Sequence, residues 1–231
     1  MNWWRYFLGF FGGPNPTWVQ KGASLRSYKR RGPVDQVILH ESVTPTTASC
    51  VKVLNRRKLG VHYSIDRDED GTVRSHVPIA RACSHAGGGH NHRSIGIEII
   101  NNYYSSRAKD EDDTITAIWA HKKGYILPLE SQMISLYRLY LWLIVYGDVH
   151  VSFPGIKDDA MYWGRTKNHQ MPGTMAHHRF HHADGLFPEC YLYLRTRGMD
   201  HTEAWSATVK AAKAGKRKTK LITEDLALRE F

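Results

Sequence analysis

An acidic residue stands in the middle of the most apolar strand that the sequence predicts. Residues 94–101, Ser-Ile-Gly-Ile-Glu-Ile-Ile-Asn, carry apolar side chains on both faces of an extended chain, as a central strand of a sheet does. Burying the carboxylate of Glu98 is costly unless the group is paired or functional. Desolvation also raises the pKa of a carboxyl group toward the range useful for general acid–base catalysis. Glu98 is therefore a candidate catalytic residue, with a salt-bridged structural role as the alternative.

The remaining pattern predicts strands and helices that alternate without a regular repeat. His40 stands at the end of a buried strand, where a side chain faces a cleft at the sheet edge. Predicted strands cover 34–39, 61–65 and 94–101, and a hairpin turn at 68–71 leads into 72–73. Predicted helices cover 48–58, capped by Thr46 or Thr47 and ended by Gly60, and 132–146. We expect an α/β fold, a single domain with a central mixed β-sheet flanked by helices.

Three segments are expected along the chain: an aromatic N-terminal extension at 1–19, a catalytic domain at 20–198 and a basic helical tail at 199–231. The aromatic start is too short to span a bilayer and shows no secretory signal, so it is either a strap over the domain or an interfacial anchor. Residues 105–115 are expected to form a surface loop and 155–173 an irregular insertion. The tail opens on the capping-box pattern Asp200-x-x-Glu203.

The net charge indicates what kind of partner to expect, and the cysteine spacing indicates whether disulfides form. The net charge is +10, which favours a polyanion, either nucleic acid or an anionic bacterial envelope. The three cysteines are far apart and form no Cys-x-x-Cys pair, so no disulfide framework is expected. We expect a monomer with no transmembrane segment.

Two histidine-rich segments carry metal-site or ligand-site chemistry. Residues 176–185 contain four histidines and one aspartate, a composition that suits zinc, which takes imidazole nitrogen and carboxylate oxygen ligands. Residues 84–92 combine three glycines with three histidines, which brings backbone and imidazole donors close to a polar ligand. The alternative for residues 84–92 is a mobile, solvated histidine-rich loop, and the alternative for residues 176–185 is a histidine-rich nucleic-acid-binding or surface segment.

The order of these motifs resembles the N-acetylmuramoyl-L-alanine amidase family, which includes amidase-type phage lysozymes, bacterial anhydro-muropeptide amidases and peptidoglycan recognition proteins. The resemblance covers residues 34–190, and its most specific part runs from Ser-His-Ala-Gly at 84–87 to Ser-Ile-Gly-Ile-Glu at 94–98.

The resemblance implies a role for each matching residue. The zinc ligands are His40, His177 and Asp184. Glu98 is the general base, and His182 takes the place of a lysine that stabilises the oxyanion. His85, Asn91 and Tyr63 are the substrate-binding residues. The motif around the second and third ligands is compressed, which leaves His178, or a shifted pair of His182 and Cys190, as alternatives. Val61 stands where some members carry a catalytic tyrosine.

The function implied is a zinc-dependent hydrolase of the amide between the lactyl group of N-acetylmuramic acid and L-alanine of peptidoglycan. The expected setting is a phage endolysin that accumulates in the host cytoplasm and reaches the cell wall at lysis. The alternatives are a non-catalytic peptidoglycan-binding protein of the same fold and a bacterial recycling amidase. A nucleic-acid-binding protein with a structural zinc gives no reason for Glu98, so we expect no specific nucleic-acid partner.

Overall fold

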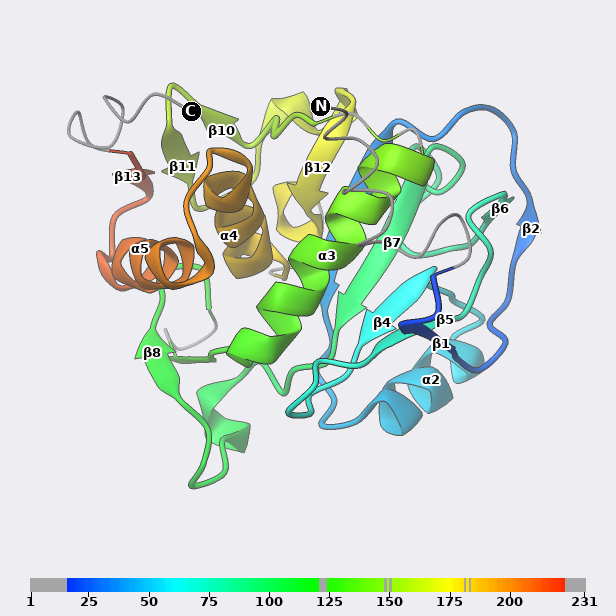
Figure 1. The fold of residues 1–231 in the computed structure, drawn as a ribbon, viewed down its shortest axis with the longest axis horizontal. Coiled ribbons are helices and arrows are strands. Elements are labelled where there is room, and N and C mark those ends of the chain that lie inside the picture. The colour runs from blue at the N-terminus through cyan, green and yellow to red at the C-terminus, as the bar shows by residue number, and fades with distance from the viewer. Residues whose placement is uncertain are drawn as a thin grey trace, which may run out of the picture.

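A mixed six-stranded β-sheet runs through the centre of the computed structural model, which describes residues 16–120, 124–147, 149, 151–180, 182 and 184–222 (Figure 1). Its strands are β1 (Val19–Lys21), β3 (Gln36–Glu41), β4 (Tyr63–Ile65), β5 (Val73–Ser75), β7 (Ser94–Ile99) and β12 (Gly173–Ala176). They lie in the order β1-β5-β4-β7-β3-β12. The strands β4, β7, β3 and β12 are parallel to one another, and β5 is antiparallel to β4. This confirms the predicted mixed sheet.

Helices cover both faces of the sheet. They are α2 (Thr47–Arg56), α3 (Glu130–Tyr146), α4 (Leu186–Thr196) and α5 (His201–Lys213). The main core lies where α3 and α4 pack on the face that carries the odd-numbered residues of β3 and β7, such as Leu39 and Ile97. On the opposite face, Val51 and Leu54 of α2 pack against a smaller cluster that includes Val61. The sheet is therefore a middle layer between helices.

Shorter elements surround this centre. Three small sheets pair β2 (Tyr28–Lys29) with β6 (Arg81–Ala82), β8 (Thr114–Thr116) with β9 (Gly124–Ile126), and β10 (Ile156–Lys157) and β11 (Ala160–Tyr162) with β13 (Lys218–Lys220). The 3₁₀ turns are η1 (Ser105–Arg107), η3 (Lys167–Gln170) and η4 (His177–Arg179). The expected irregular insertion at 155–173 thus contains a hairpin, which the late strand β13 extends.

Several expected boundaries move by a few residues. Helix α2 starts at Thr47, and Thr46 caps it through a capping box as predicted, but it ends at Arg56 because Lys58 takes a left-handed conformation before Gly60. Strand β3 continues through His40 to Glu41, because both residues pair with β7. The expected surface loop at 105–115 contains η1 and the first residues of β8.

The first described strand pairs with the central sheet, and the last described helix packs into the main core. β1 pairs with β5, and the predicted cap Asp200 begins α5, whose Ala204 and Ala211 belong to the main core. The aromatic run at 3–11 and the terminal residues 223–231 lie outside the described residues. Among the described helices, none is both long enough and apolar enough to cross a membrane.

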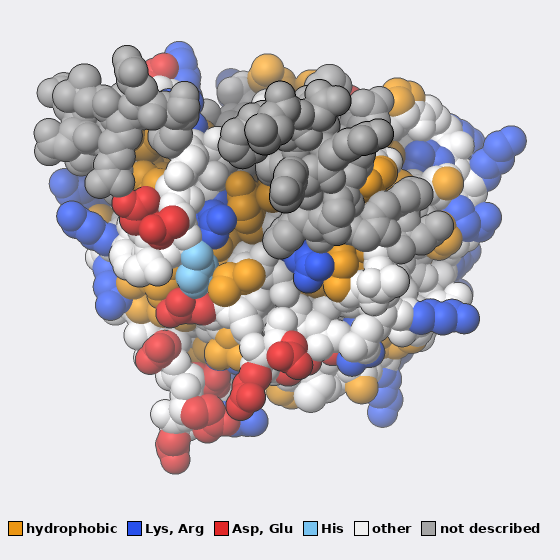
Figure 2. All heavy atoms as spheres, in the orientation of Figure 1, with side chains coloured by type: hydrophobic (Ala, Val, Ile, Leu, Met, Phe, Trp, Pro, Cys, Tyr) orange, Lys and Arg blue, Asp and Glu red, His pale blue; other side chains and the backbone are white. Residues whose placement is uncertain are grey.

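Charge is distributed unevenly over the surface. On the face shown in Figure 2, acidic side chains gather around β8 and the loop before it, and Lys and Arg side chains stand around the rim. The described part of this face therefore carries both acidic and basic side chains.

Candidate functional site

Two strands of the parallel part of the sheet carry the first two site residues side by side. His40 of β3 is the register partner of Glu98 of β7, so both side chains leave the sheet on the same face. Both stand near the carboxyl ends of their strands, which is where parallel sheets present ligand-binding residues. His40 is 5% exposed and Glu98 is 7% exposed.

The segment that follows the edge strand β12 brings the other two residues of the cluster, His177 at the start of η4 and Asp184 just before α4. Ala176 pairs with Leu39, so His177, the next residue, reaches the level of His40. The Nδ1 atom of His177 lies 3.2 Å from Oδ1 of Asp184, and Nδ1 of His40 lies 3.5 Å from Oδ2 of the same carboxylate. One ligand atom from each of these three residues lies within 4.8 Å of the other two. This spacing suits a single metal ion.

The backbone after Asp184 is held by a residue that the sequence did not single out. The carboxylate of Glu41, at the end of β3, accepts the N–H of Gly185 at 3.0 Å and hydrogen bonds from Tyr125 and Asn101. Gly185 itself has a φ of +83°, and a Cβ atom there would meet the carbonyl oxygen of Leu39 at 2.1 Å. Only glycine fits this turn. The predicted strand stopped at residue 39, so nothing in the sequence pattern indicated that Glu41 is buried in β3.

The cluster opens into a cavity of about 580 Å³. Its walls come from β3, α2, the loop at 84–91 and the segment at 103–107; they include Cys50, Val53, Leu54, Arg57, Val61, Gly87, Asn91, Tyr103, Tyr104, Arg107 and His182. The cavity combines apolar side chains with a few polar groups that converge on His40 and Glu98, as ligand-binding pockets do.

The carboxylates of the site are shifted in opposite directions. Burial, reinforced by the negative charges of Asp184 and Glu41, raises the pKa of Glu98 well above its ordinary value. Burial also raises the pKa of Glu41 to about 7, although its hydrogen bonds oppose the shift. Burial acts in the same direction on Asp184, but its contacts with the imidazoles of His177 and His40 outweigh burial and hold the pKa of Asp184 below its ordinary value. Asp184 is thus kept as an anion, and Glu98 is suited to exchanging a proton.

His85 lines the cavity next to His40, and both of its ring nitrogens are within hydrogen-bond distance of other side chains. Its Nδ1 atom is 3.0 Å from Nε2 of His40, and its Nε2 atom is 3.0 Å from Oγ of Ser94. The ring lies against the backbone of Gly96, where a Cβ atom would come within 2.7 Å of Nδ1. Burial and nearby cationic groups lower the pKa of His85 well below its ordinary value, so the ring is neutral.

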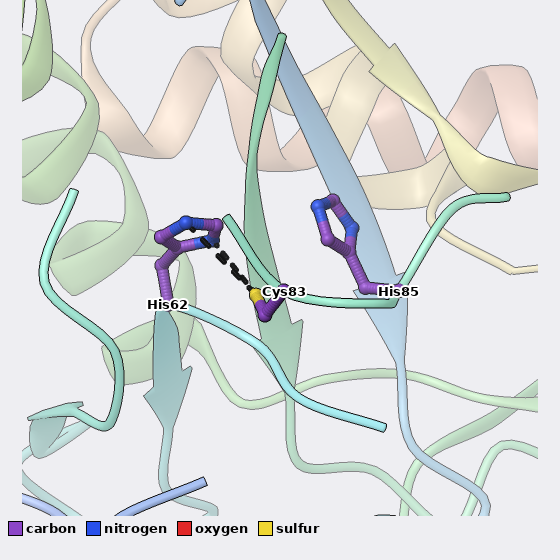
Figure 3. Close-up of side chains that lie close together, drawn as sticks. All are labelled: His62, Cys83 and His85. Carbon is purple, nitrogen blue, oxygen red and sulfur yellow. Dashed lines mark hydrogen bonds between the residues drawn. The ribbon is translucent and has the colours of Figure 1, made fainter. Parts of the chain in front are cut away.

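A second cluster with metal-like spacing, His62, Cys83 and His85, lies next to the first (Figure 3). Its hydrogen bonds use the atoms that a metal would need. Nδ1 of His62 accepts the N–H of Gly96 at 3.0 Å, and Nε2 lies 3.0 Å from the carbonyl oxygen of Arg81 and 3.0 Å from the guanidinium of Arg30. Burial raises the pKa of the Cys83 thiol to about 12, which keeps it protonated. The cluster is better explained as a hydrogen-bonded support for His85.

Of the other predicted site residues, His182 and Asn91 line the cavity and Tyr63 does not. His182 is exposed, and its ring centroid lies 5.2 Å from that of His177. Asn91 lines the cavity, and its Oδ1 accepts the main-chain N–H groups of His85 and Ala86. Tyr63 is not brought to the cavity. It points to the opposite face of the sheet and packs edge-on against Trp142 in the main core.

The two alternative ligands also lie elsewhere. Cys190 is fully buried in the main core, and burial raises the pKa of its thiol to about 12. His178 follows His177 in the turn η4, and neither it nor Cys190 belongs to a metal-spaced group within the described part of the chain. Within that part, the compact set is His40, His177 and Asp184.

Comparisons with known proteins find solved structures that match parts of the chain at low sequence identity. A comparison with curated protein sequences finds no match. Among solved structures, the hydrolase AmiA of Staphylococcus aureus in complex with its ligand is 14% identical, covering 81% of this chain and 79% of that chain with a TM-score of 0.47. The endolysin amidase LysCS of Clostridium intestinale is 20% identical (56% and 78% covered, TM-score 0.34). The Drosophila peptidoglycan recognition protein SA is 17% identical (60% and 70% covered, TM-score 0.39).

A family model identifies the chain more directly. The model described as N-acetylmuramoyl-L-alanine amidase matches residues 30–174, which is more than half of the 231 residues. The matched segment holds His40, His85 and Glu98 and ends three residues before His177. Members of this family include amidases and peptidoglycan-binding proteins that do not cut. The chain belongs to the N-acetylmuramoyl-L-alanine amidase family.

Proposed function

We propose that the protein is a zinc-dependent N-acetylmuramoyl-L-alanine amidase that hydrolyses the amide between the lactyl group of N-acetylmuramic acid and L-alanine of the stem peptide. The observation that carries the proposal is the convergence of His40, His177, Asp184 and Glu98 in one cavity. The family match supports the substrate class.

The donor set fits zinc. Two imidazole Nδ1 atoms face one carboxylate that is held as an anion, and three protein ligands leave a coordination position open, as in catalytic zinc sites. His40, His177 and Asp184 would hold the ion. Bound there, Zn²⁺ supplies Lewis acidity toward the scissile carbonyl and toward a water molecule.

Glu98 carries the proton transfers in this proposal. Its carboxylate accepts a proton from the water that attacks the amide carbon, and the same group then donates that proton to the leaving nitrogen of L-alanine. The raised pKa of Glu98 makes its carboxylate a stronger proton acceptor for the first half of this exchange. His182, at the exposed rim, donates a hydrogen bond to the oxyanion when protonated. The nucleophile is water, so no covalent intermediate forms.

Digestion of purified sacculi tests the proposal. Zinc-loaded protein is expected to release stem peptides with a free L-alanine amino terminus and leave glycan strands intact. Glu98→Gln removes the proton acceptor at constant size and should lower the rate by about 100-fold or more while zinc content stays the same. The matched control is Glu111→Gln, an exposed acid remote from the cavity. Undiminished release by Glu98→Gln would contradict the role of Glu98.

One observation favours a second candidate, a peptidoglycan-binding protein that does not cut. Val61 lines the cavity at the position where some family members carry a catalytic tyrosine, so a hydroxyl is missing there. In this case, zinc-loaded protein would sediment with sacculi and release no stem peptide. The buried acid Glu98 in the cavity favours the enzyme.

We propose a phage endolysin as the biological setting, made in the host cytoplasm and acting on the cell wall at lysis. The net charge of +10 supports retention on an anionic envelope. A recycling amidase is the competing setting, and the substrate form separates the two. An endolysin cuts cross-linked sacculi, whereas a recycling amidase cuts soluble anhydro-muropeptides and leaves sacculi intact.

A further inference from the structure

A chain of hydrogen bonds leads away from the metal cluster and ends at a backbone carbonyl group. It runs from Nε2 of His40 to Nδ1 of His85 (3.0 Å), from Nε2 of His85 to Oγ of Ser94 (3.0 Å), and from Oγ of Ser94 to the carbonyl oxygen of His90 (2.7 Å). His40 and Ser94 are buried, and His85 is partly buried and lines the cavity.

The carbonyl group at the end of this series of hydrogen bonds determines which atom donates and which accepts in each of them. A carbonyl oxygen only accepts, so the hydroxyl of Ser94 donates its one proton to His90. The lone pairs of that hydroxyl are then available to accept the N–H at Nε2 of His85. A neutral imidazole with its proton on Nε2 has a lone pair on Nδ1, which accepts the N–H at Nε2 of His40. His40 is thereby left with a lone pair on Nδ1, the atom that faces Asp184.

The surroundings hold His85 in this place. The Oδ1 atom of Asn91 accepts the main-chain N–H groups of His85 and Ala86, which fixes the loop. The absent side chain of Gly96 leaves room for the ring against β7. The ring of His62 stands at 88° to the ring of His85, with centroids 5.8 Å apart, and closes the far side (Figure 3).

We infer that His85 is a positioning residue for the metal site: with Ser94, it selects the tautomer of His40 that offers Nδ1 to the ion. The inference rests on the proposed zinc site and changes the role expected from the sequence, which was substrate binding. Partners that orient a metal-binding imidazole in this way typically change metal affinity by about 10- to 100-fold when they are removed.

Three substitutions separate positioning from other roles. His85→Asn places Oδ1 where Nδ1 stood and keeps an acceptor for His40. His85→Leu has a similar volume and no acceptor. Ser94→Ala keeps the ring of His85 but removes the group that fixes its polarity. The dissociation constant of Zn²⁺ is measured for each by competition with a chromophoric chelator, and thermal unfolding in EDTA checks that each apoprotein is folded.

The expected order of affinities is the wild type, then His85→Asn, then Ser94→Ala, then His85→Leu, with the last weakened by about 10- to 100-fold. If His85→Leu binds Zn²⁺ as tightly as the wild type and only raises the KM for muropeptide, His85 is a substrate contact and the inference is overturned.

A second measurement does not depend on metal. Long-range ¹H–¹⁵N spectra of the zinc-free wild type should show His85 with its proton on Nε2 and a lone pair on Nδ1. A proton on Nδ1 of His85 overturns the inference, because that atom could then accept no hydrogen bond from His40. Failure of the zinc proposal has a different signature, because the wild type would then bind no Zn²⁺ while the tautomer of His85 remains as stated.

Discussion

His40 and Glu98 are register partners on the parallel strands β3 and β7, so the sheet itself sets the spacing between an imidazole and a carboxylate of the site. Neighbouring strands lie about 4.8 Å apart, and this separation changes little while the ladder of backbone hydrogen bonds is intact. His177 and Asp184 depend instead on a turn and a short loop. The site thus has one half built on rigid strands and another half whose placement depends on local contacts.

The two adjacent histidines of the turn η4 should differ sharply in metal binding. His177→Ala removes an Nδ1 atom 3.2 Å from Asp184 and is expected to abolish stoichiometric zinc binding. His178→Ala is the matched control and should retain one zinc per chain, because His178 belongs to no metal-spaced group in the described residues. Elemental analysis after dialysis checks both variants. Zinc lost from His178→Ala and kept in His177→Ala would reverse the assignment.

Gly185 should tolerate no side chain. In Gly185→Ala, the Cβ atom meets the carbonyl oxygen of Leu39 at 2.1 Å, and the residue must hold a φ of +83°. The strained φ alone costs about 1–3 kcal/mol of unfolding free energy, and the loop that carries Asp184 has to move. We expect lower stability in urea together with weaker zinc binding.

Gly88→Ala serves as its control, because nothing lies within 4 Å of a Cβ atom at that position. It should leave both measurements unchanged. Equal effects in the two variants would mean that Gly185 has no special part in placing Asp184.

A buried ion pair between η4 and α4 should contribute to the stability of the fold around the site. Arg179 and Glu189 are both fully buried, with Nε of Arg179 2.8 Å from Oε2 of Glu189, which also accepts the N–H of Ala176. Arg179→Met leaves Glu189 buried without its cation and is expected to reduce the unfolding free energy by about 3–5 kcal/mol. Lys109→Ala breaks an exposed pair with Glu111 and should change it by less than about 1 kcal/mol. Chemical denaturation measures both, and a small effect of Arg179→Met would contradict this role.

His62 should make the stability of the apoprotein depend on pH. Burial, with a smaller contribution from the charge of Arg30, lowers the pKa of His62 to about 4, whereas an unfolded histidine titrates near about 6.5. Between these values the unfolded chain binds a proton that folded His62 does not, so the unfolding free energy falls as pH decreases from about 6.5 to about 4. The full effect is about 3 kcal/mol.

The comparison for this effect is His62→Gln, measured in EDTA so that metal binding does not contribute. Because the variant lacks the titrating group, the stability difference between wild type and variant should shrink as the pH falls through this window. A difference that stays constant from pH 7 to pH 4 would rule out the buried neutral state of His62.

The sequence predicted the parts of the site that follow from local patterns. The apolar strand around Glu98 and the buried strand that leads to His40 have strong periodicity, and their pairing places both residues on one face. The compressed motif gave His177 and Asp184 through the family resemblance, and the structure brings both to His40.

The parts that were missed depend on contacts between distant segments. Side chains alternate along β4, so Tyr63 and Ser64 face opposite sides of the sheet, and the motif alone did not tell which side carries the cavity. Glu41 is buried by Tyr125 and Gly185, which come from far along the chain. The third strand of the small sheet at 156–162, β13, comes from more than fifty residues later in the chain. No local pattern could reveal these pairings.

The position of β12 at the edge of the sheet has a consequence for the protein during its synthesis. A nascent chain on the ribosome can pair β3, β4 and β7 once about 100 residues have emerged, but it then holds only His40 and Glu98 of the cluster. His177 and Asp184 arrive some eighty residues later, when β12 docks beside β3. A chain interrupted before that point lacks two of the three residues of the compact set His40, His177 and Asp184, so the set is completed only when β12 has docked.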